Sequence, residues 1–170
     1  MLSSDQQNGL LGARVECLWA LTGEVVADAG NNKIRKVTPD GNVTTLAGNG
    51  RGGLVDGLGA AAGFCFPLGV AVGSDGNIFV ADSGNHCIKK ITPDGTVSTV
   101  AGSGTSVLLD SMGTAAQFNG PESVAVDVDG NLFVADKHNH SVRKIAPDAT
   151  VITLAGSNER GSADGPGVVA

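Results

Sequence analysis

The sequence predicts an all-β fold built from β-propeller blades, arranged as an incomplete ring of about three blades. One observation is a sequence motif that repeats every 54 residues, so that Asp28, Asp82 and Asp136 occupy equivalent positions. A fixed period of this order is typical of propellers and solenoids. A second observation is composition, because the 170 residues include 26 glycines and no tyrosine. Short apolar runs bounded by Gly, Asp and Pro favour many short strands joined by tight turns.

Each copy of the motif is interpreted as a four-stranded antiparallel sheet. In the second copy Asp75-Gly76 marks a hairpin turn after the first strand, and Pro93-Asp94-Gly95 marks the turn before the fourth. The strands expected in this copy are Gly69–Val72, Ile78–Asp82, Cys87–Ile91 and Thr96–Ala101. The first two are apolar at nearly every position, which predicts burial on both faces of the sheet.

The third and fourth strands carry more charge than the first two. Because lysine and arginine usually keep their charged ends in water, we expect these strands at the wet outer rim. The cations concerned are Lys89, Lys90, Arg143 and Lys144.

The period divides the chain into blades and spacers. The first blade is expected to be degenerate, because residues 15–23 lack the tight Asp-Gly turn of the other copies. The expected segments are a loose leader (1–14), a first blade (15–48), a spacer (49–66), a second blade (67–102), a spacer (103–120), a third blade (121–156) and a truncated spacer (157–170).

The two complete spacers share the pattern Asp-x-x-Gly-x-Ala-Ala-x-Phe, which starts at Asp56 and at Asp110. The alanine pairs suggest one helical turn, and Phe64 and Phe118 are expected to fill the seams between neighbouring sheets. Ala149 stands where the other copies have glycine before their fourth strand. Alanine is disfavoured in the left-handed region, so we expect a slightly different turn there.

Charge and cysteine content limit the classes of function. The formal net charge is −6, which argues against a nucleic-acid partner because phosphate contacts need a basic surface. The N-terminus does not resemble a signal peptide and no apolar run is long enough to span a membrane. The count of three cysteines is odd and contains no C-x-x-C pair. We expect free thiols, which point to an intracellular compartment.

The repeated units resemble NHL repeats. The resemblance is carried by the phrases V-A-D-x-x-N-H-x-I-x-K-I-x-P-D-G and P-x-x-V-A-V-D-x-D-G-N-L-F-V-A-D, and by the Asn-His steps at Asn85-His86 and Asn139-His140. Asn31-Asn32 departs from the pattern by one residue. The resemblance covers residues from about Glu24 to Asp164 and implies a β-propeller, commonly of six blades, that serves as a recognition platform.

Three blades raise an energetic problem, because six at this period need about 320 residues. An open arc exposes an apolar blade face at each end. Ten wet apolar side chains would forfeit about 15–30 kcal/mol, against a typical domain stability of about 5–15 kcal/mol. We therefore expect that the chain is a fragment of a longer product, or that it needs another propeller half or self-association to close the ring.

Polar residues that recur at equivalent positions have both structural and functional interpretations. A carboxylate ring around a channel could bind cations, but recurrence in every copy favours turn residues that accept N–H bonds from their own loop. We assign this structural role to Asp28, Asp82, Asp136, Asn31, Asn85 and Asn139.

Two further motifs suggest metals. His138-x-His140 beside Asp136 could form part of a zinc site, and Asp127–Asn131 resembles part of a calcium loop. Loop stabilisation and a hairpin turn, respectively, are favoured instead. No catalytic residue, metal site or cofactor is assigned.

We expect a non-enzymatic scaffold that binds unidentified protein partners through loops on one face, since variable loops on a rigid fold commonly carry binding. The candidate contact residues are Arg51, Asn85, His86, Lys137, His138, His140 and Arg160. The alternatives are a metal-dependent propeller enzyme of the lactonase or lyase type, and an RNA-binding propeller. Lyases that share the type of propeller implied by the resemblance use a catalytic tyrosine. The chain has no tyrosine, which argues against that activity.

Overall fold

The computed structural model describes residues 23–161 and 164–167. This part of the chain forms three antiparallel sheets, with strand orders β1-β2-β3, β4-β8-β7-β6-β5 and β10-β11-β12-β13-β9. The strands are β1 (Glu24–Asp28), β2 (Lys33–Val37), β3 (Val43–Ala47), β4 (Gly57–Leu58), β5 (Pro67–Val72), β6 (Ile78–Asp82), β7 (Cys87–Ile91), β8 (Thr96–Ala101), β9 (Ser111–Met112), β10 (Pro121–Val126), β11 (Leu132–Asp136), β12 (Ser141–Ile145) and β13 (Thr150–Ala155). Single 3-10 turns are η1 (Ala29–Asn31), η2 (Gly59–Ala61), η3 (Ser83–Asn85), η4 (Gly113–Ala115) and η5 (Lys137–Asn139).

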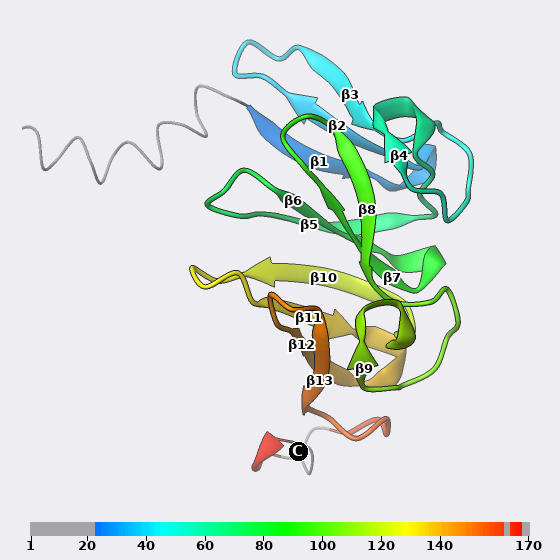
Figure 1. Cartoon of the computed structure of the whole chain (residues 1–170), viewed down its shortest axis with the longest axis vertical. Helices are drawn as coiled ribbons and strands as arrows, with labels where there is room; N and C mark the ends of the chain where they lie inside the picture. Colours follow the sequence, from blue (N-terminus) through cyan, green and yellow to red (C-terminus); the bar gives the residue numbers. More distant parts are fainter. Residues whose placement is uncertain (1–22, 162–163, 168–170) are drawn as a thin grey trace, which may run out of the picture.

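The three sheets stack one after another, with β1–β3 at the top of Figure 1 and β9–β13 at the bottom. The first strands of the second and third blades, β5 and β10, lie against each other. Each full sheet continues outward from its first strand through three consecutive antiparallel neighbours. This is the blade architecture of a β-propeller, and the predicted all-β fold with an incomplete ring of three blades is confirmed.

Each full blade has a fifth strand that the sequence did not predict. Residues Gly57–Leu58 pair with the start of β8, and Ser111–Met112 pair with the start of β13. Each spacer thus forms a strap across the outer edge of the next blade before it reaches that blade's first strand. The η2 and η4 turns that follow in the straps are the predicted helical turns.

The turn at Ala149 corrects one expectation. Its N–H donates to the Ala146 carbonyl, as Gly95 N–H does to Thr92 and Gly41 N–H to Thr38. Ala149 has φ 68°, in the left-handed region that Gly41 and Gly95 also occupy. The third copy therefore keeps the same turn and tolerates a strained alanine, at a cost of about 1 kcal/mol.

The apolar core lies in the two seams between blades. Phe64 is fully buried in the seam between the first and second blades, among residues that include Ile34 and Val80. Phe118 is fully buried in the next seam, among residues that include Ile88 and Val134. Both phenylalanines come from the straps, so each strap fills the seam that it crosses, as the repeated pattern predicts.

The expectation of a uniformly wet rim was wrong for the third strands. Lys89 and Arg143 are completely buried, whereas Lys90 and Lys144 are partly exposed. Because side chains alternate along a strand, one cation of each adjacent pair points into the blade interior and needs a partner there.

Among the residues described, no helix has the length and apolarity to cross a membrane. Cys65 and Cys87 are free thiols, and Cys17 lies outside the described residues. Burial raises the pKa of the Cys87 thiol, which keeps it protonated and unreactive.

Candidate functional site

Two kinds of loop meet at one side of the molecule. We call this side the loop face and define it by the turns η1, η3 and η5 and the spacer segments 49–56 and 103–110. The Asn85 side chain of η3 donates to the Gly53 carbonyl, and the Asn139 side chain of η5 donates to the Val107 carbonyl. The spacer loops project to the right in Figure 1, whereas the β5–β6 and β10–β11 hairpin turns project to the left.

An Asp-Asn pair organises each turn of the loop face. Asp82 accepts the Asn85 amide at 2.7 Å, and Asp136 accepts the Asn139 amide at 2.8 Å. Asp28 accepts the Asn31 amide at 2.9 Å in the first copy. Because these side chains form hydrogen bonds within the chain, the Asn85 amide nitrogen is not available to a partner.

The aspartates also hold the incoming strap, which the sequence did not predict. The other oxygen of Asp82 accepts the Cys65 N–H at 2.7 Å, and that of Asp136 accepts the Asn119 N–H at 2.7 Å. Their backbone donors thus belong to the preceding spacer, 17 residues earlier, rather than to their own loop. Asp82 and Asp136 therefore fix the points where the two straps enter the second and third blades.

In the first and second copies, the residue after the turn Asn links its blade to the next one. His86 Nδ1 accepts the Gly120 N–H at 3.0 Å, across a separation of 34 residues. Asn32, in the same position of the first copy, accepts the Phe66 N–H at 2.8 Å through its side-chain oxygen. Both residues end a 3-10 turn in the left-handed conformation. One acceptor atom is all that this position needs, which explains why Asn can replace His there.

We expect His86→Asn to preserve this link and His86→Ala to lose it. The alanine variant leaves the partly buried Gly120 N–H without its acceptor, which should lower the free energy of unfolding by about 1–2 kcal/mol. The asparagine variant should lie within about 0.5 kcal/mol of the natural chain. Urea denaturation of the three proteins measures this, and equal losses in both variants would contradict the assignment.

A buried cation ties each strap to its blade. Lys89 Nζ lies 2.7 Å from Asp56 and 3.3 Å from the Val55 carbonyl. Asp56 also accepts the N–H and hydroxyl of Thr99 at 2.9 and 3.0 Å. Lys89 Nζ lies 5.7 Å from the centroid of the Phe64 ring. The strap is thus held by charge, hydrogen bonds and its own buried aromatic ring together.

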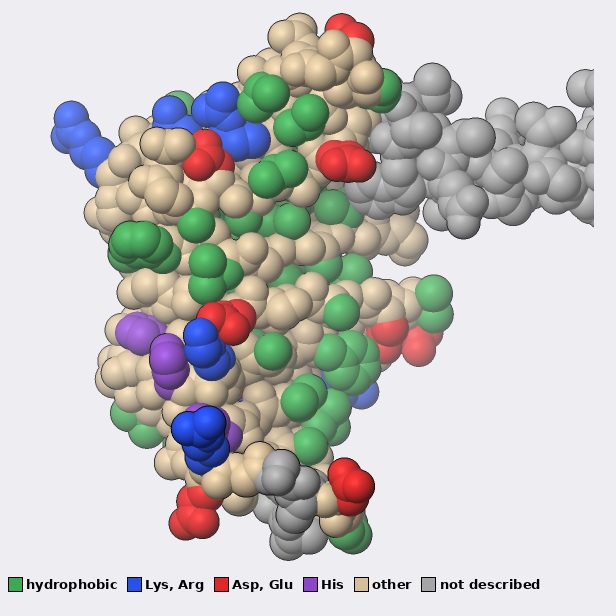
Figure 2. All heavy atoms as spheres, turned by 180° about the vertical axis from the view of Figure 1, so that it is seen from behind, with side chains coloured by type: hydrophobic (Ala, Val, Ile, Leu, Met, Phe, Trp, Pro, Cys, Tyr) green, Lys and Arg blue, Asp and Glu red, His purple; other side chains and the backbone are tan. Residues whose placement is uncertain are grey.

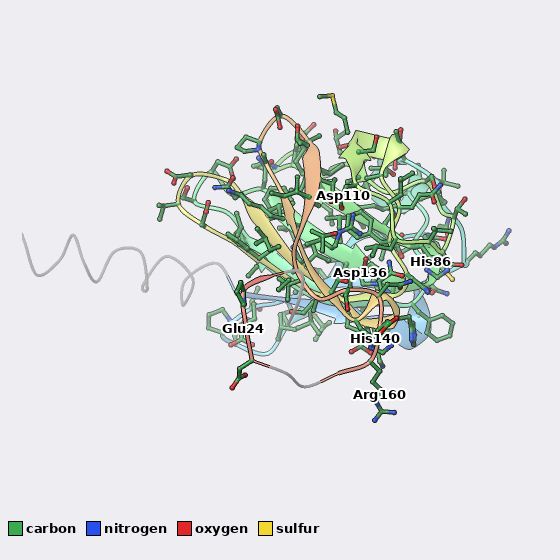
Figure 3. All side chains as sticks on the ribbon, turned by 90° about the horizontal axis from the view of Figure 1, so that it is seen from below. Glu24, His86, Asp110, Asp136, His140 and Arg160 are labelled. Atoms are coloured by element: carbon green, nitrogen blue, oxygen red, sulfur yellow. The ribbon has the colours of Figure 1, made fainter. Side chains whose placement is uncertain are left out.

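Arginine extends the same arrangement in the third blade. Arg143 reaches Asp110 at 2.6 Å and Asp136 at 2.9 Å, so that one guanidinium joins the strap to the turn of the loop face. It also donates to the Gln117 and Leu109 carbonyls. Figure 3 labels Asp110 and Asp136, the two carboxylates that this guanidinium joins.

The strap carboxylates Asp56 and Asp110 stabilise the folded chain more at neutral pH than at acid pH. Burial alone would raise their pKa, but hydrogen bonds from Lys89 and Thr99 hold the pKa of Asp56 below its usual value. Thr153 and Arg143 lower the pKa of Asp110 in the same way. Because these pKa values are depressed in the folded state, the stability they contribute is present above the unfolded pKa and is lost as pH falls through the folded pKa.

Asp82 behaves in the opposite sense. Burial raises its pKa from 3.8 to about 6, since the Lys89 ammonium bonds Asp56 and is not hydrogen-bonded to Asp82. A raised carboxyl pKa means that the folded state favours the protonated acid. The resulting stability is full below the unfolded pKa of 3.8 and is lost as pH rises through about 6.

Lys89→Arg is therefore expected to stabilise the chain at pH 7. The guanidinium can bond Asp56 and Asp82 together, as Arg143 bonds the two equivalent carboxylates. The expected gain is about 1–2 kcal/mol at pH 7 and less at pH 4, where Asp82 is largely protonated. Denaturation at the two pH values measures it, with Lys90→Arg as the matched control on the neighbouring position. A gain that is equal at both pH values would contradict this account of Asp82.

Several predicted contact residues lie exposed on or beside the loop face. Arg51, Lys137 and Arg160 are exposed, as are His138 and His140, whereas His86 is half-buried. Lys137 forms an ion pair with Glu122. Figure 2 shows the histidines grouped with Lys and Arg side chains at one edge, and Figure 3 shows His86, His140 and Arg160 on the side opposite to Glu24.

Exposed apolar side chains accompany these cations. Phe66 is 59% exposed, and Leu54, Val55, Val107 and Leu109 of the spacers are between 42% and 49% exposed. Phe66 was not among the predicted contact residues, although it follows the buried Phe64 by two positions and is replaced by glycine in the next copy.

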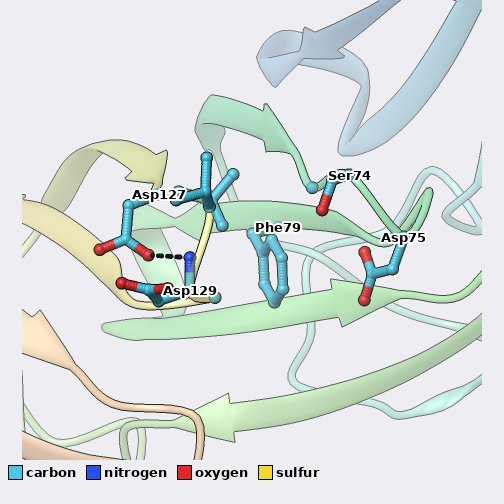
Figure 4. A pocket seen from close by; sticks show the side chains of 9 residues that line it. Ser74, Asp75, Phe79, Asp127 and Asp129 are labelled. Carbon is cyan, nitrogen blue, oxygen red and sulfur yellow. Dashed lines mark hydrogen bonds between the residues drawn. The ribbon is translucent and has the colours of Figure 1, made fainter.

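A small pocket of about 210 Å³ lies at the opposite end, between the β5–β6 and β10–β11 turns. Figure 4 shows Asp75, Asp127 and Asp129 around it with the Phe79 ring. Asp127 accepts the N–H groups of Asp129 and Asn131, as in a hairpin turn. Within the described ranges, no group of three or more His, Cys, Asp or Glu side chains could hold a metal ion.

The blades, straps and recurring Asp-Asn turns together define a β-propeller repeat protein. The NHL repeat pattern matches residues 64–91 and 118–145, which are the strap aromatic and first three strands of the second and third copies. The chain belongs to the NHL-repeat family.

Two of the curated relatives illustrate the sequence similarity. The chain is 39% identical over 104 residues to the chloroplastic protein SUPPRESSOR OF QUENCHING 1 of Arabidopsis thaliana, covering 58% of the chain. It is 32% identical over 141 residues to NHL repeat-containing protein 2 of Gallus gallus, covering 76% of the chain. The chain spans 10% and 19% of these relatives' own lengths.

Solved structures show the same fold. A protein of unknown function from Bacteroides thetaiotaomicron superposes with a TM-score of 0.57 at 30% identity, covering 75% of this chain and 30% of that one. A gluconolactonase from Xanthomonas campestris superposes with a TM-score of 0.56 at 20% identity, covering 77% of this chain and 42% of that one. At 20% identity, the similarity to the gluconolactonase shows a shared fold and nothing about activity.

Proposed function

We propose that the chain acts without catalysis as an NHL-repeat scaffold that binds a protein partner on its loop face. One observation carries the proposal. Phe66 has φ 46°, in the left-handed region, and its side chain is 59% exposed. A bulky residue in this conformation costs about 1–2 kcal/mol. The equivalent residue of the next copy is Gly120, with φ 62°, so glycine already serves this backbone position.

An exposed, strained phenylalanine gains little for the fold of the described chain. Strain of this kind is found at sites where function requires it. Aromatic side chains, phenylalanine included, are also enriched at the centres of protein interfaces. The framework beneath Phe66 is rigid, because its N–H is bonded to Asn32 and the preceding Cys65 is bonded to both Asp82 and Gly84.

The surroundings of Phe66 favour a particular kind of partner. Elsewhere on and beside the loop face, Leu54 and Val107 add apolar surface, and Arg51 and Arg160 add positive charge to a chain whose net charge is −6. A peptide or protein surface with an apolar side chain flanked by carboxylates would complement this arrangement. Charge reversal at Arg51, Lys137 or Arg160 should weaken binding to such a surface.

Phe66→Gly separates function from folding. Relief of the left-handed strain should leave the free energy of unfolding unchanged or raise it by about 1 kcal/mol, while partner binding is lost. Thermal unfolding measures the first effect. For the second, a photo-crosslinking phenylalanine analogue at position 66 should capture a partner, and the same analogue at Val128, 91% exposed at the opposite end, serves as the control.

The crosslinking result must depend on the basic residues to support the proposal. Arg51→Glu and Arg160→Glu should each reduce the product formed from position 66 without lowering the unfolding temperature, because both side chains are exposed. Equal capture from positions 66 and 128, or destabilisation by Phe66→Gly, would overturn the proposal.

A further inference from the structure

The described blades leave two apolar faces uncovered, one at each end of the stack in Figure 1. On the first blade, Val26 and Val43 are 42% and 49% exposed. Their counterparts one period later, Val80 and Val97, are buried in the seam between the first two blades. The missing cover is therefore a blade on the other side of β1–β3.

The third blade presents the complementary face. Val142 is 43% exposed and Ala135 is exposed, whereas their counterparts Ile88 and Ala81 are buried in the seam between the second and third blades. In that seam, the face of the second blade that carries Ile88 and Ala81 packs against the face of the third blade that carries Val134 and Val151. Val134 and Val151 are the third-blade counterparts of Val26 and Val43. The two ends of the described arc thus match each other as its internal seams do.

The first blade also carries a polar site, formed by Arg35 and Thr45, which we call the receptor. Arg35 and Thr45 are the counterparts of Lys89 and Thr99, and of Arg143 and Thr153. A register shift occurs at the same place in all three sheets, next to the cation. In the second and third blades a strap aspartate joins the cation to the threonine.

The first blade has no such aspartate among the described residues. Arg35 donates to the Thr45 hydroxyl at 2.9 Å. Unlike Lys89 and Arg143, it forms no ion pair with a carboxylate of the described residues. Its buried Nε has no hydrogen-bond partner, a feature that it shares with Arg143. The receptor therefore lacks a carboxylate that its two counterparts possess.

The third spacer carries the carboxylate that would fit. Asp164 follows Asp110 by one period of 54 residues. The Gly156 N–H donates to the Gly167 carbonyl, as Gly102 does to Gly113 and Gly48 to Gly59. Asp164 thus precedes its closing glycine by three residues, as Asp56 precedes Gly59. The described part of the third spacer thus repeats the closing hydrogen bond of a strap, and Asp164 bonds no cation within the described ranges.

We propose that two copies of this chain associate head to tail, so that the third blade of each copy packs against the first blade of the other. Asp164 of one copy then bonds Arg35 and Thr45 of its partner copy. The Gly167 N–H would also donate to the Gly41 carbonyl, as the Gly59 N–H donates to Gly95 and the Gly113 N–H to Ala149. Two identical joints close a six-bladed ring with twofold symmetry, which is the usual closed form of a homodimer.

Charge exchange between the two partners tests this directly. Arg35→Asp removes the cation of the receptor and Asp164→Arg removes the carboxylate that bonds it, so each variant alone should lose the dimer. In a mixture, the two substituted side chains face each other at one joint with their charges exchanged, and natural Asp164 faces natural Arg35 at the second joint. The mixture should therefore form a heterodimer although neither variant forms a homodimer. Sedimentation equilibrium of the full 170-residue chain measures all four samples.

A dimer of the natural chain that is weakened at least tenfold in each variant and restored by mixing supports the proposal. A monomeric natural chain would overturn it and would point to another strap or partner as the occupant. Dimers that persist in both variants, or a folded mixture that does not associate, would also overturn it. Circular dichroism establishes folding of each variant. Phe66 takes no part in these joints, so failure here leaves the proposed loop-face binding untouched.

Discussion

Replacing Arg143 with methionine is expected to lower the free energy of unfolding by about 3–5 kcal/mol. The side chain is completely buried and neutralises Asp136, which is also completely buried. Methionine occupies a similar volume but leaves that carboxylate without its charged partner. It also removes the contacts to Asp110, to two strap carbonyls and to the face of Phe118, whose ring centroid lies 4.9 Å from Arg143 Cζ.

The neighbouring Lys144→Met is the control for this experiment. Lys144 is partly exposed on the same strand, and its replacement should change stability by about 0.5 kcal/mol or less. Adding Asp136→Asn to Arg143→Met should recover part of the loss, since the second change removes the buried charge. Similar losses at positions 143 and 144 in urea denaturation would show that burial of Arg143 does not matter in solution.

Phe118→Ala is expected to cost about 3–5 kcal/mol, because it empties the seam between the second and third blades. Phe118 is fully buried and packs with residues of both sheets. Loss of the ring also removes one side of the environment of Arg143. Chemical denaturation measures the change at one fixed protein concentration, because association would contribute to the apparent stability.

Phe66→Ala is the matched control for the seam. Phe66 belongs to a strap as Phe118 does, but its ring is 59% exposed. Its replacement should change stability by less than about 1 kcal/mol. Comparable losses for the two phenylalanines would contradict the role assigned to the strap aromatic.

The strands of the second and third blades could be predicted from the sequence because turn chemistry and apolar runs agree there. Ile78–Asp82, Cys87–Ile91 and Thr96–Ala101 begin and end where Asp-Gly, Pro and Gly residues predict. The β4 and β9 strands have two residues each, which is too short for any periodicity. They depend on pairing with a later blade, so local sequence carries no sign of them.

The strap tie could have been found from the sequence, but only by comparison across copies. A charged residue in a strand is ordinarily interpreted as exposed, and Lys89 and Arg143 were misassigned for that reason. The signal is a triplet in which an aspartate precedes a cation by 33 residues and a threonine by 43. Because Asp56-Lys89-Thr99 and Asp110-Arg143-Thr153 both fit it, recurrence at a fixed offset identifies the contact.

The candidate contact residues came from loops that vary between copies, and the structure gives them different surroundings. Asn85 is committed to internal bonds, whereas Arg51 and Arg160 are exposed. Phe66 was missed because its distinguishing feature is a backbone dihedral angle. A sequence shows only that glycine replaces it in the next copy, and residue type alone does not reveal strain.

A double-mutant cycle between Asp110 and Arg143 tests most directly whether ion pairs between a buried cation and a strap aspartate join each strap to its blade. Asp110→Asn, Arg143→Met and the double variant are denatured in urea beside the natural chain at pH 7. We expect a coupling free energy of about 1–3 kcal/mol, since the two residues are in contact. A coupling free energy within about 0.3 kcal/mol of zero would contradict the account, because independent residues give additive effects.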